Sequence, residues 1–256
     1  MIEPIRHDKT DTANRVRGRI ESVLDWATVR GYRTGDNPAR WRGHLSEVLP
    51  SRARVQKTVH RAALPYGDVP AFMKALRARE GVAARALELT ILTGARRGEV
   101  IGAAWDEVDL TQRIWTVPAE RIKGGREHRV PLSTRAIELL EGLPREGKNP
   151  FVFIGPRRGG LSNMAMASVL ARMGHDSITV HGFRSAFRDW AAESTSYSNH
   201  VVEMALAHVI DDKVEAAYRR GDLFEKRRRL MVDWSRYCTA EPAAIDRRVV
   251  ALARSA

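Results

Sequence analysis

Four short motifs in this sequence carry side chains that could bind or attack a phosphate group. The first is TGARRGEV, in which Arg96 lies among apolar neighbours, three residues before Glu99. A buried arginine requires a carboxylate or a phosphate as its partner, and Glu99 could orient Arg96 on the same helix face. Taken alone, the motif is more often ordinary surface charge beside a turn.

The second motif, HGFRSAFRDW, places His181 and Arg184 three residues apart on one helical face, which Arg188 continues. Such a pair can present an imidazole and a guanidinium to one phosphate. Taken alone, the pattern is better explained by a capped amphipathic helix with a solvated basic face.

The last two motifs could supply a nucleophile and an acid. In MALAHVIDDKVEAAYRRGD, His208 ends an apolar helix, and Tyr218 follows beside Arg219 and Arg220. Most such tyrosines are packing residues, but neighbouring cations can stabilise a phenolate that attacks phosphorus. Lys123 is predicted at the tip of a hairpin, where lysine is usually solubilising but can also reach into a cleft.

Several other chemistries are excluded by spacing. The segment GLPREGK at 142–148 has the spacing of a phosphate-binding loop, but Asn149-Pro150 follows it, and the expected strand comes after it. The eight histidines form no pair at helical ligand spacing, and the single Cys238 excludes a disulfide framework or a multi-cysteine zinc site. We therefore expect no metal and no cofactor.

The composition points to a polyanionic partner. The 256 residues include 43 Lys+Arg and 31 Asp+Glu, for a net charge of +12. Most of the basic residues are arginines, which grip phosphate bidentately, although a bias of the source genome is the alternative explanation. No apolar run approaches the ~20 residues of a membrane span, and the N-terminus lacks a signal peptide. These features predict a cytoplasmic protein that binds nucleic acid and not a membrane.

Helices and a few short strands must position these motifs. Helical spacing of apolar residues and turn residues predict helices at 10–31, after Pro38, and at 68–80, 82–93, 96–104, 133–143, 162–173, 181–194, 199–207, 211–220 and 223–239. Strands are predicted at 106–110, 113–117, 120–123, 128–132 and 151–154, with Gly124-Gly125 as a hairpin turn. The predicted fold class is mainly α (α+β), with a small antiparallel sheet.

Taken in order, the motifs resemble the tyrosine recombinase, or phage integrase, family, and most of all the integrases of prophages and genomic islands. TGARRGE resembles the first arginine box of the family, RIKGGREHRVPLS its lysine hairpin, HGFR its His-x-x-Arg box, and ALAH with AAYRRGD its final histidine and nucleophilic tyrosine. Ala95 and Ala207 stand where many members have Leu and Gly, and both changes look tolerable because neither side chain does chemistry.

The resemblance implies four regions. They are a partial, helical core-binding region at 1–49, a basic linker at 50–65, a catalytic domain at 66–240 and a C-terminal tail at 241–256. Beyond the catalytic residues, the side chains expected to contact DNA are Arg52, Arg54, Lys57, Arg61, Arg188 and Arg219.

The resemblance also implies a mechanism. Arg96 and Arg184 would neutralise the phosphate, while Tyr218 would attack phosphorus and form a 3′-phosphotyrosyl bond without ATP or metal. His181 is the expected proton acceptor for Tyr218, and Lys123 the expected acid for the leaving oxygen. We further expect His208 to donate a hydrogen bond to the phosphate and Glu99 to hold Arg96 in place.

The expected partners follow from the same resemblance. They are double-stranded DNA at attachment sites, three further copies of the chain in a tetramer on DNA formed from free monomers, and accessory DNA-bending proteins. The tail at 241–256 would link neighbouring protomers. Two alternatives remain open: strand relaxation like that of a type IB topoisomerase, and a non-catalytic DNA-binding remnant of a truncated integrase.

Overall fold

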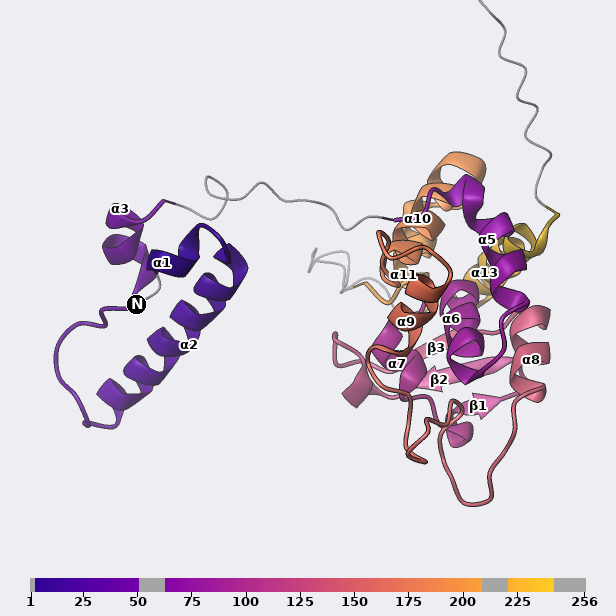
Figure 1. Cartoon of the computed structure of the whole chain (residues 1–256), viewed down its shortest axis with the longest axis horizontal. Coiled ribbons are helices and arrows are strands. Elements are labelled where there is room, and N and C mark those ends of the chain that lie inside the picture. Colours follow the sequence, from indigo (N-terminus) through magenta and orange to yellow (C-terminus); the bar gives the residue numbers. More distant parts are fainter. Residues whose placement is uncertain (1–2, 51–62, 209–220, 242–256) are drawn as a thin grey trace, which may run out of the picture. The chain divides into compact units, whose positions relative to one another are not determined.

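The computed structural model describes residues 3–50, 63–208 and 221–241. The chain divides into two compact units, Met1–His60 and Arg61–Ala256 (Figure 1). Several predicted features lie outside the described residues: the helix at 211–220, the tail at 242–256, and the side chains of Arg52, Arg54, Lys57, Arg61, Tyr218 and Arg219. Within the described parts, no helix has the length and apolar character that a membrane span requires.

The first unit is held together largely by polar contacts. It contains α1 (Glu3–Arg6), α2 (Thr10–Val29), the irregular turn η1 (Trp41–Leu45) and α3 (Ser46–Val48). Arg6 is buried, lies over the Trp41 ring at 4.8 Å and donates to the Pro50 carbonyl. The Asn37 amide donates to Asp25 at 2.7 Å. Among the described residues of this unit, only Ala13 and Ala39 are buried apolar side chains, which is too little for an apolar core of its own.

The second unit is mainly helical around one buried helix. Its helices are α5 (Val69–Arg77), α6 (Val82–Thr93), α7 (Arg97–Ile101), α8 (Thr134–Glu141), α9 (Ala165–Arg172), α10 (Gly182–Ser194), α11 (Asn199–Ala205) and α13 (Phe224–Thr239). Helix α6 lies in the middle and contacts α5, α7, α8, α9 and α13 (Figure 1). Nine of its twelve residues are buried, so it forms the centre of the apolar core.

A small antiparallel sheet packs beside these helices. Its strands are β1 (Val108–Asp109), β2 (Ile114–Val117) and β3 (His128–Pro131), in that order, and β3 contacts α13. In the register, Val117 lies opposite His128. The predicted fold class, mainly α with a small antiparallel sheet, is therefore confirmed.

Two predicted strands are wrong. Residues 120–123 do not form a strand, because a turn of 3₁₀ helix, η4 (Ala119–Arg121), occupies the segment after Pro118, and β3 pairs with β2 instead. The apolar run at 151–154 forms only isolated bridges, Ala104 to Phe151 and Ile154 to Gly160. A short apolar run does not by itself distinguish a strand from other buried backbone.

The apolar stripe of helix α13 packs on the core of its own unit. Leu230 and Trp234 are fully buried, and Leu223 packs against the same core. The Trp234 indole also donates to the Ile91 carbonyl at 2.8 Å, which fixes α13 against α6. The elements that carry the candidate site are thus packed on a single core.

Candidate active site

Arg96 is the residue immediately before α7, and Glu99 fixes it there. The Arg96 backbone N–H donates to Glu99 Oε2 at 2.8 Å, and its Nη1 donates to Glu99 Oε1 at 2.9 Å. Glu99 is 3% exposed, so the carboxylate is held rigidly and can orient the guanidinium. The remaining Nη2 of Arg96 donates to the Ala207 carbonyl at 3.0 Å.

Arg184 lies in the first turn of α10 and is buried, 5% exposed. Its Nη1 donates to the Gly94 carbonyl, and its Nη2 donates to the Leu206 carbonyl at 2.6 Å. Burial, followed by the charge of Arg96, lowers the pKa of Arg184 to about 10, so it remains a cation at neutral pH. Among the described residues, no carboxylate forms an ion pair with it, and its Nε has no partner.

The end of α11 anchors both arginines. Helix α11 closes with Ala207 in the left-handed region, at φ 49°. The Ala207 N–H bonds the Met204 carbonyl, and the His208 N–H bonds the Glu203 carbonyl. This pair of bonds is a Schellman motif. It turns the successive carbonyls of Leu206 and Ala207 toward Arg184 and Arg96, and so brings the two guanidiniums together.

His208 lies beside the two arginines. We call the site formed by Arg96, Arg184 and His208 the arginine pocket. Arg184 Nη2 donates to His208 Nε2 at 2.9 Å. On the other side of the ring, His208 Nδ1 lies 2.5 Å from Glu203 Oε2, and Glu203 Oε1 lies 2.8 Å from Arg188 Nε. The sequence analysis missed Glu203. The available signal was a carboxylate in an otherwise apolar helix, five residues before His208.

His128 is a second residue that the sequence analysis missed. Burial, and then the charge of Arg227, lowers its pKa to about 4, with smaller contributions from Arg96 and Arg184. A hydrogen bond to the Ala205 backbone opposes this shift. His128 is therefore neutral near pH 7 and places no further positive charge beside the arginine pocket.

The other predicted site residues lie around the same elements. His181 is the residue just before α10, three residues from Arg184, and its side chain is exposed. Lys123 is exposed in the loop between η4 and β3, where Gly125 but not Gly124 has a positive φ. Arg121 donates to the Glu99 carbonyl at 3.1 Å, so the loop that carries Lys123 begins beside α7.

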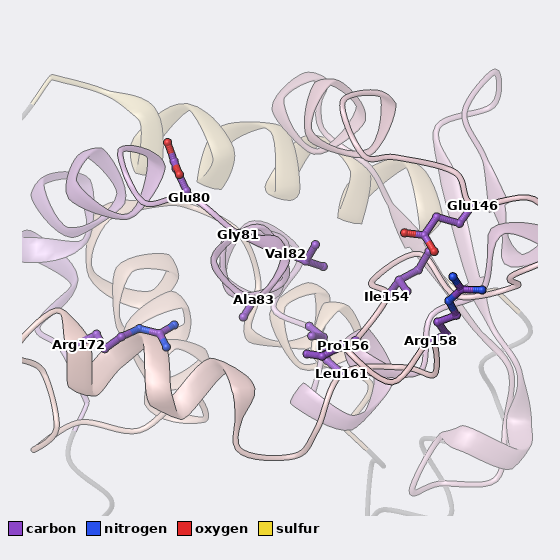
Figure 2. Close-up of a pocket in the computed structure, with 11 residues that line it drawn as sticks. Glu80, Gly81, Val82, Ala83, Glu146, Ile154, Pro156, Arg158, Leu161 and Arg172 are labelled. Atoms are coloured by element: carbon purple, nitrogen blue, oxygen red, sulfur yellow. The ribbon is translucent and has the colours of Figure 1, made fainter.

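A separate hollow of about 530 Å³ lies where the N-terminus of α6 meets α9 and the loop after residue 153 (Figure 2). Val82, Pro156 and Leu161 supply apolar lining, whereas Glu80, Glu146, Arg158 and Arg172 are charged. None of the residues that line it is a predicted catalytic residue. Within the described part of the chain, no three His, Cys, Asp or Glu side chains gather as a metal site requires.

Comparison with known proteins identifies the family. The sequence profile of the Phage integrase family matches residues 63–222, and that of the Phage integrase central domain matches residues 1–44. The chain belongs to the phage integrase family. Each of the matched motifs around Arg96, Lys123, His181, Arg184, His208 and Tyr218 lies within the first of these matches.

Two curated relatives of this phage integrase family member are similar over most of its length. Prophage integrase IntZ of Escherichia coli strain K12 is 33% identical over 92% of the chain, and the integrase of Enterobacteria phage P4 is 33% identical over 91%. The chain spans 57% of the length of each relative.

Solved integrase structures share the fold. A lambda integrase(75-356) dimer bound to a COC' core site matches with a TM-score of 0.57 and 19% identity, covering 81% of this chain and 76% of that one. An integrase from mycobacterium phage Brujita matches with a TM-score of 0.53 and 22% identity, covering 91% of this chain and 77% of that one.

Proposed function

We propose that this chain is the catalytic part of a site-specific DNA recombinase that integrates or excises a prophage or genomic island. The observation that carries the proposal is the arginine pocket, in which the Nη atoms of the buried cation Arg184 meet only carbonyls and an imidazole among the described residues. A buried cation without a carboxylate of its own is suited to receive an anion. Membership of the phage integrase family supports a DNA phosphate as that anion.

In this proposal the two arginines stabilise the charge that develops on the phosphate. Arg184 and Arg96 donate hydrogen bonds to the non-bridging oxygens of the phosphate. They thereby stabilise the transition state of the attack on phosphorus. Both are already fixed to the end of α11, so little reorganisation is needed when the phosphate enters. Glu99 keeps Arg96 oriented throughout.

Tyr218 is the proposed nucleophile. Its phenolic oxygen bonds to phosphorus as the bond from phosphorus to the 5′ oxygen breaks, giving a 3′-phosphotyrosyl linkage. His181 accepts the phenolic proton, and Lys123 gives a proton to the leaving 5′ oxygen. The reverse reaction with the 5′-hydroxyl of another strand completes recombination, and the covalent linkage conserves the energy of the broken bond.

The proposed partners are double-stranded DNA attachment sites and further copies of the chain. Among proteins of the same fold, one lambda integrase structure is a tetramer bound to a Holliday junction. We propose the same for this chain, with monomers in free solution, and keep accessory DNA-bending proteins as an expectation. Strand relaxation and a non-catalytic remnant are not favoured by relatives that are integrases.

A nicked suicide duplex tests the proposal, because cleavage beside the nick releases a short fragment and traps the covalent adduct. The wild-type chain should form a protein–DNA adduct, and Tyr218→Phe should form none while still binding the duplex. Tyr32→Phe, at a tyrosine that is 74% exposed in the first unit, is the matched control and should form the adduct. An adduct with Tyr218→Phe would show that the nucleophile is another residue.

A further inference from the structure

We propose that Glu203 is a positioning residue that fixes the ring and the tautomer of His208 for its contact with the phosphate. The inference rests on the proposed function, because it concerns the same arginine pocket. Glu203 touches neither the phosphate nor the nucleophile in this scheme and acts only through His208.

The backbone at the end of α11 brings Glu203 and His208 together. In the Schellman motif of this helix, the His208 N–H bonds the Glu203 carbonyl at 3.0 Å. The side chains at these two positions of the motif commonly make an apolar contact. Here a carboxylate and an imidazole take their place, with His208 Nδ1 at 2.5 Å from Glu203 Oε2. The pairing is therefore built into the way the helix ends.

The hydrogen-bond donors around His208 determine its tautomer. A guanidinium can only donate, so His208 Nε2, at 2.9 Å from Arg184 Nη2, must accept. A neutral ring then carries its proton on Nδ1 and donates it to Glu203 Oε2. Arg188 Nε lies 2.8 Å from the other carboxylate oxygen of Glu203 and forms an ion pair with it, without hydrogen-bond geometry. The carboxylate therefore has a partner on each side.

In this arrangement, Nε2 is the atom of His208 that can contact the phosphate. When a phosphate oxygen enters and Arg184 donates to it instead, Nε2 is freed. It can then take a proton from solvent water and donate a hydrogen bond to the same phosphate. The proton on Nδ1 remains donated to Glu203 Oε2, and the Glu203 carboxylate also balances the charge of the imidazolium. Without the carboxylate, the ring can adopt the other tautomer, whose Nε2 proton points at the donors of Arg184.

Glu203→Gln is the sharpest variant, because it keeps the shape of the side chain. Whichever way the amide is turned, its NH2 group faces either the Arg188 guanidinium or His208 Nδ1. We expect the rate of adduct formation on a nicked suicide duplex to fall at least ~10-fold, in line with the loss of other carboxylates that orient a histidine. The duplex Kd should change less than about threefold, because the arginines remain.

The matched control is Glu225→Gln, which removes the same negative charge from a side chain that is 74% exposed on α13. It should leave the cleavage rate unchanged. Wild-type cleavage rates in Glu203→Gln, with adduct formed normally, would overturn the inference.

A measurement independent of cleavage separates this inference from the proposed function. With ¹⁵N-labelled histidine, NMR of the wild-type chain should show His208 protonated on Nδ1, and Glu203→Gln should show a shift toward protonation on Nε2. A wild-type ring protonated on Nε2 alone would overturn the inference even if cleavage is normal. Failure of the wild-type chain to form any adduct would instead count against the proposed function, while the NMR result still decides the role of Glu203.

Discussion

The positive charges of the two arginines in the candidate site are compensated in different ways. Arg96 has its own carboxylate in Glu99, whereas the Nη atoms of Arg184 meet the carbonyls of Gly94 and Leu206 and the His208 ring. Carbonyl dipoles hold the position of a cation without cancelling its charge. We therefore expect Arg184 to contribute the stronger attraction for an anion.

Arg184→Lys tests whether this role depends on the shape of the guanidinium. A lysine ammonium is a compact charge and cannot reach both carbonyls and still present a donor to the phosphate. We expect adduct formation to fall about 100-fold or more, as when a preorganised donor to a reacting oxygen is removed. Arg172→Lys, at an exposed arginine of α9, is the charge-matched control. If Arg184→Lys cleaves at the control rate, a point charge is sufficient at this position.

His128 makes the unfolding free energy of the protein decrease at acidic pH. Its pKa is about 4 in the folded chain, below the ordinary value of 6.5. Between these values the unfolded chain binds more protons, so stability is full above pH 6.5 and is lost as the pH falls toward 4. We expect the unfolding free energy to drop by about 1–2 kcal/mol from pH 7.5 to 5 through this group.

Urea unfolding of the wild-type chain and of His128→Gln at both pH values measures this contribution. Because glutamine does not titrate, the variant should lose the part of the pH dependence that belongs to His128. Equal pH dependence in the two proteins would mean that the imidazole is not held in its neutral form.

At the scale of the elements, the closing turn of α11 carries a conformational cost. Ala207 has φ 49° in the position that the family commonly fills with glycine. Alanine at this position was expected to be tolerable because its side chain does no chemistry, but a residue with a Cβ is strained by about 1–2 kcal/mol in the left-handed region.

Ala207→Gly should therefore stabilise the chain. We expect a gain of about 1 kcal/mol, which raises the Tm by about 2–4 °C for a unit of this size. The Arg96 contact uses the Ala207 carbonyl and is kept. Ala205→Gly, at the last residue of α11, is the control and should cost about 1 kcal/mol because its backbone is helical. A lower Tm for Ala207→Gly in thermal unfolding would contradict this account.

The elements also show how far the sequence could predict the fold. Helix α6 was predicted with its observed bounds because its apolar run ends at Gly94, which the structure places at a positive φ. The run at 151–154 was misread as a strand, since an apolar run reports burial and not backbone pairing. Local patterns therefore predicted the long helices and failed on short segments whose shape depends on distant neighbours.

In the candidate site, too, some contacts join residues that are close in the sequence, and others join residues that are far apart. The pairing of Arg96 with Glu99 follows from their spacing of three residues. The contact of Arg184 with Gly94 joins residues 90 apart, and Glu203 and His128 reach the pocket only through the packing of α11 and β3. Motif order identified the residues, whereas their acceptors and positioning partners required the fold.

At the scale of the whole molecule, the apolar core is unevenly shared between the two units. The large apolar core belongs to the second unit, whereas the first leaves Val23, Trp26, Val29, Tyr32 and Val48 at least half exposed. The chain as a whole carries a net charge of +12. Its affinity for DNA should therefore come mainly from attraction to the phosphate backbone and not from reading of base edges.

We accordingly expect weak and strongly salt-dependent binding of duplex DNA by this chain alone. Each neutralised phosphate releases condensed counterions, so a footprint of about six phosphates would raise the Kd roughly 10³-fold between 50 and 200 mM salt. Fluorescence anisotropy of a labelled duplex across this range gives the slope, and a duplex of scrambled sequence should give nearly the same values. A Kd that barely changes with salt would show that the arginines do not carry the affinity. Tight binding of one sequence over its scrambled control would show that base contacts dominate.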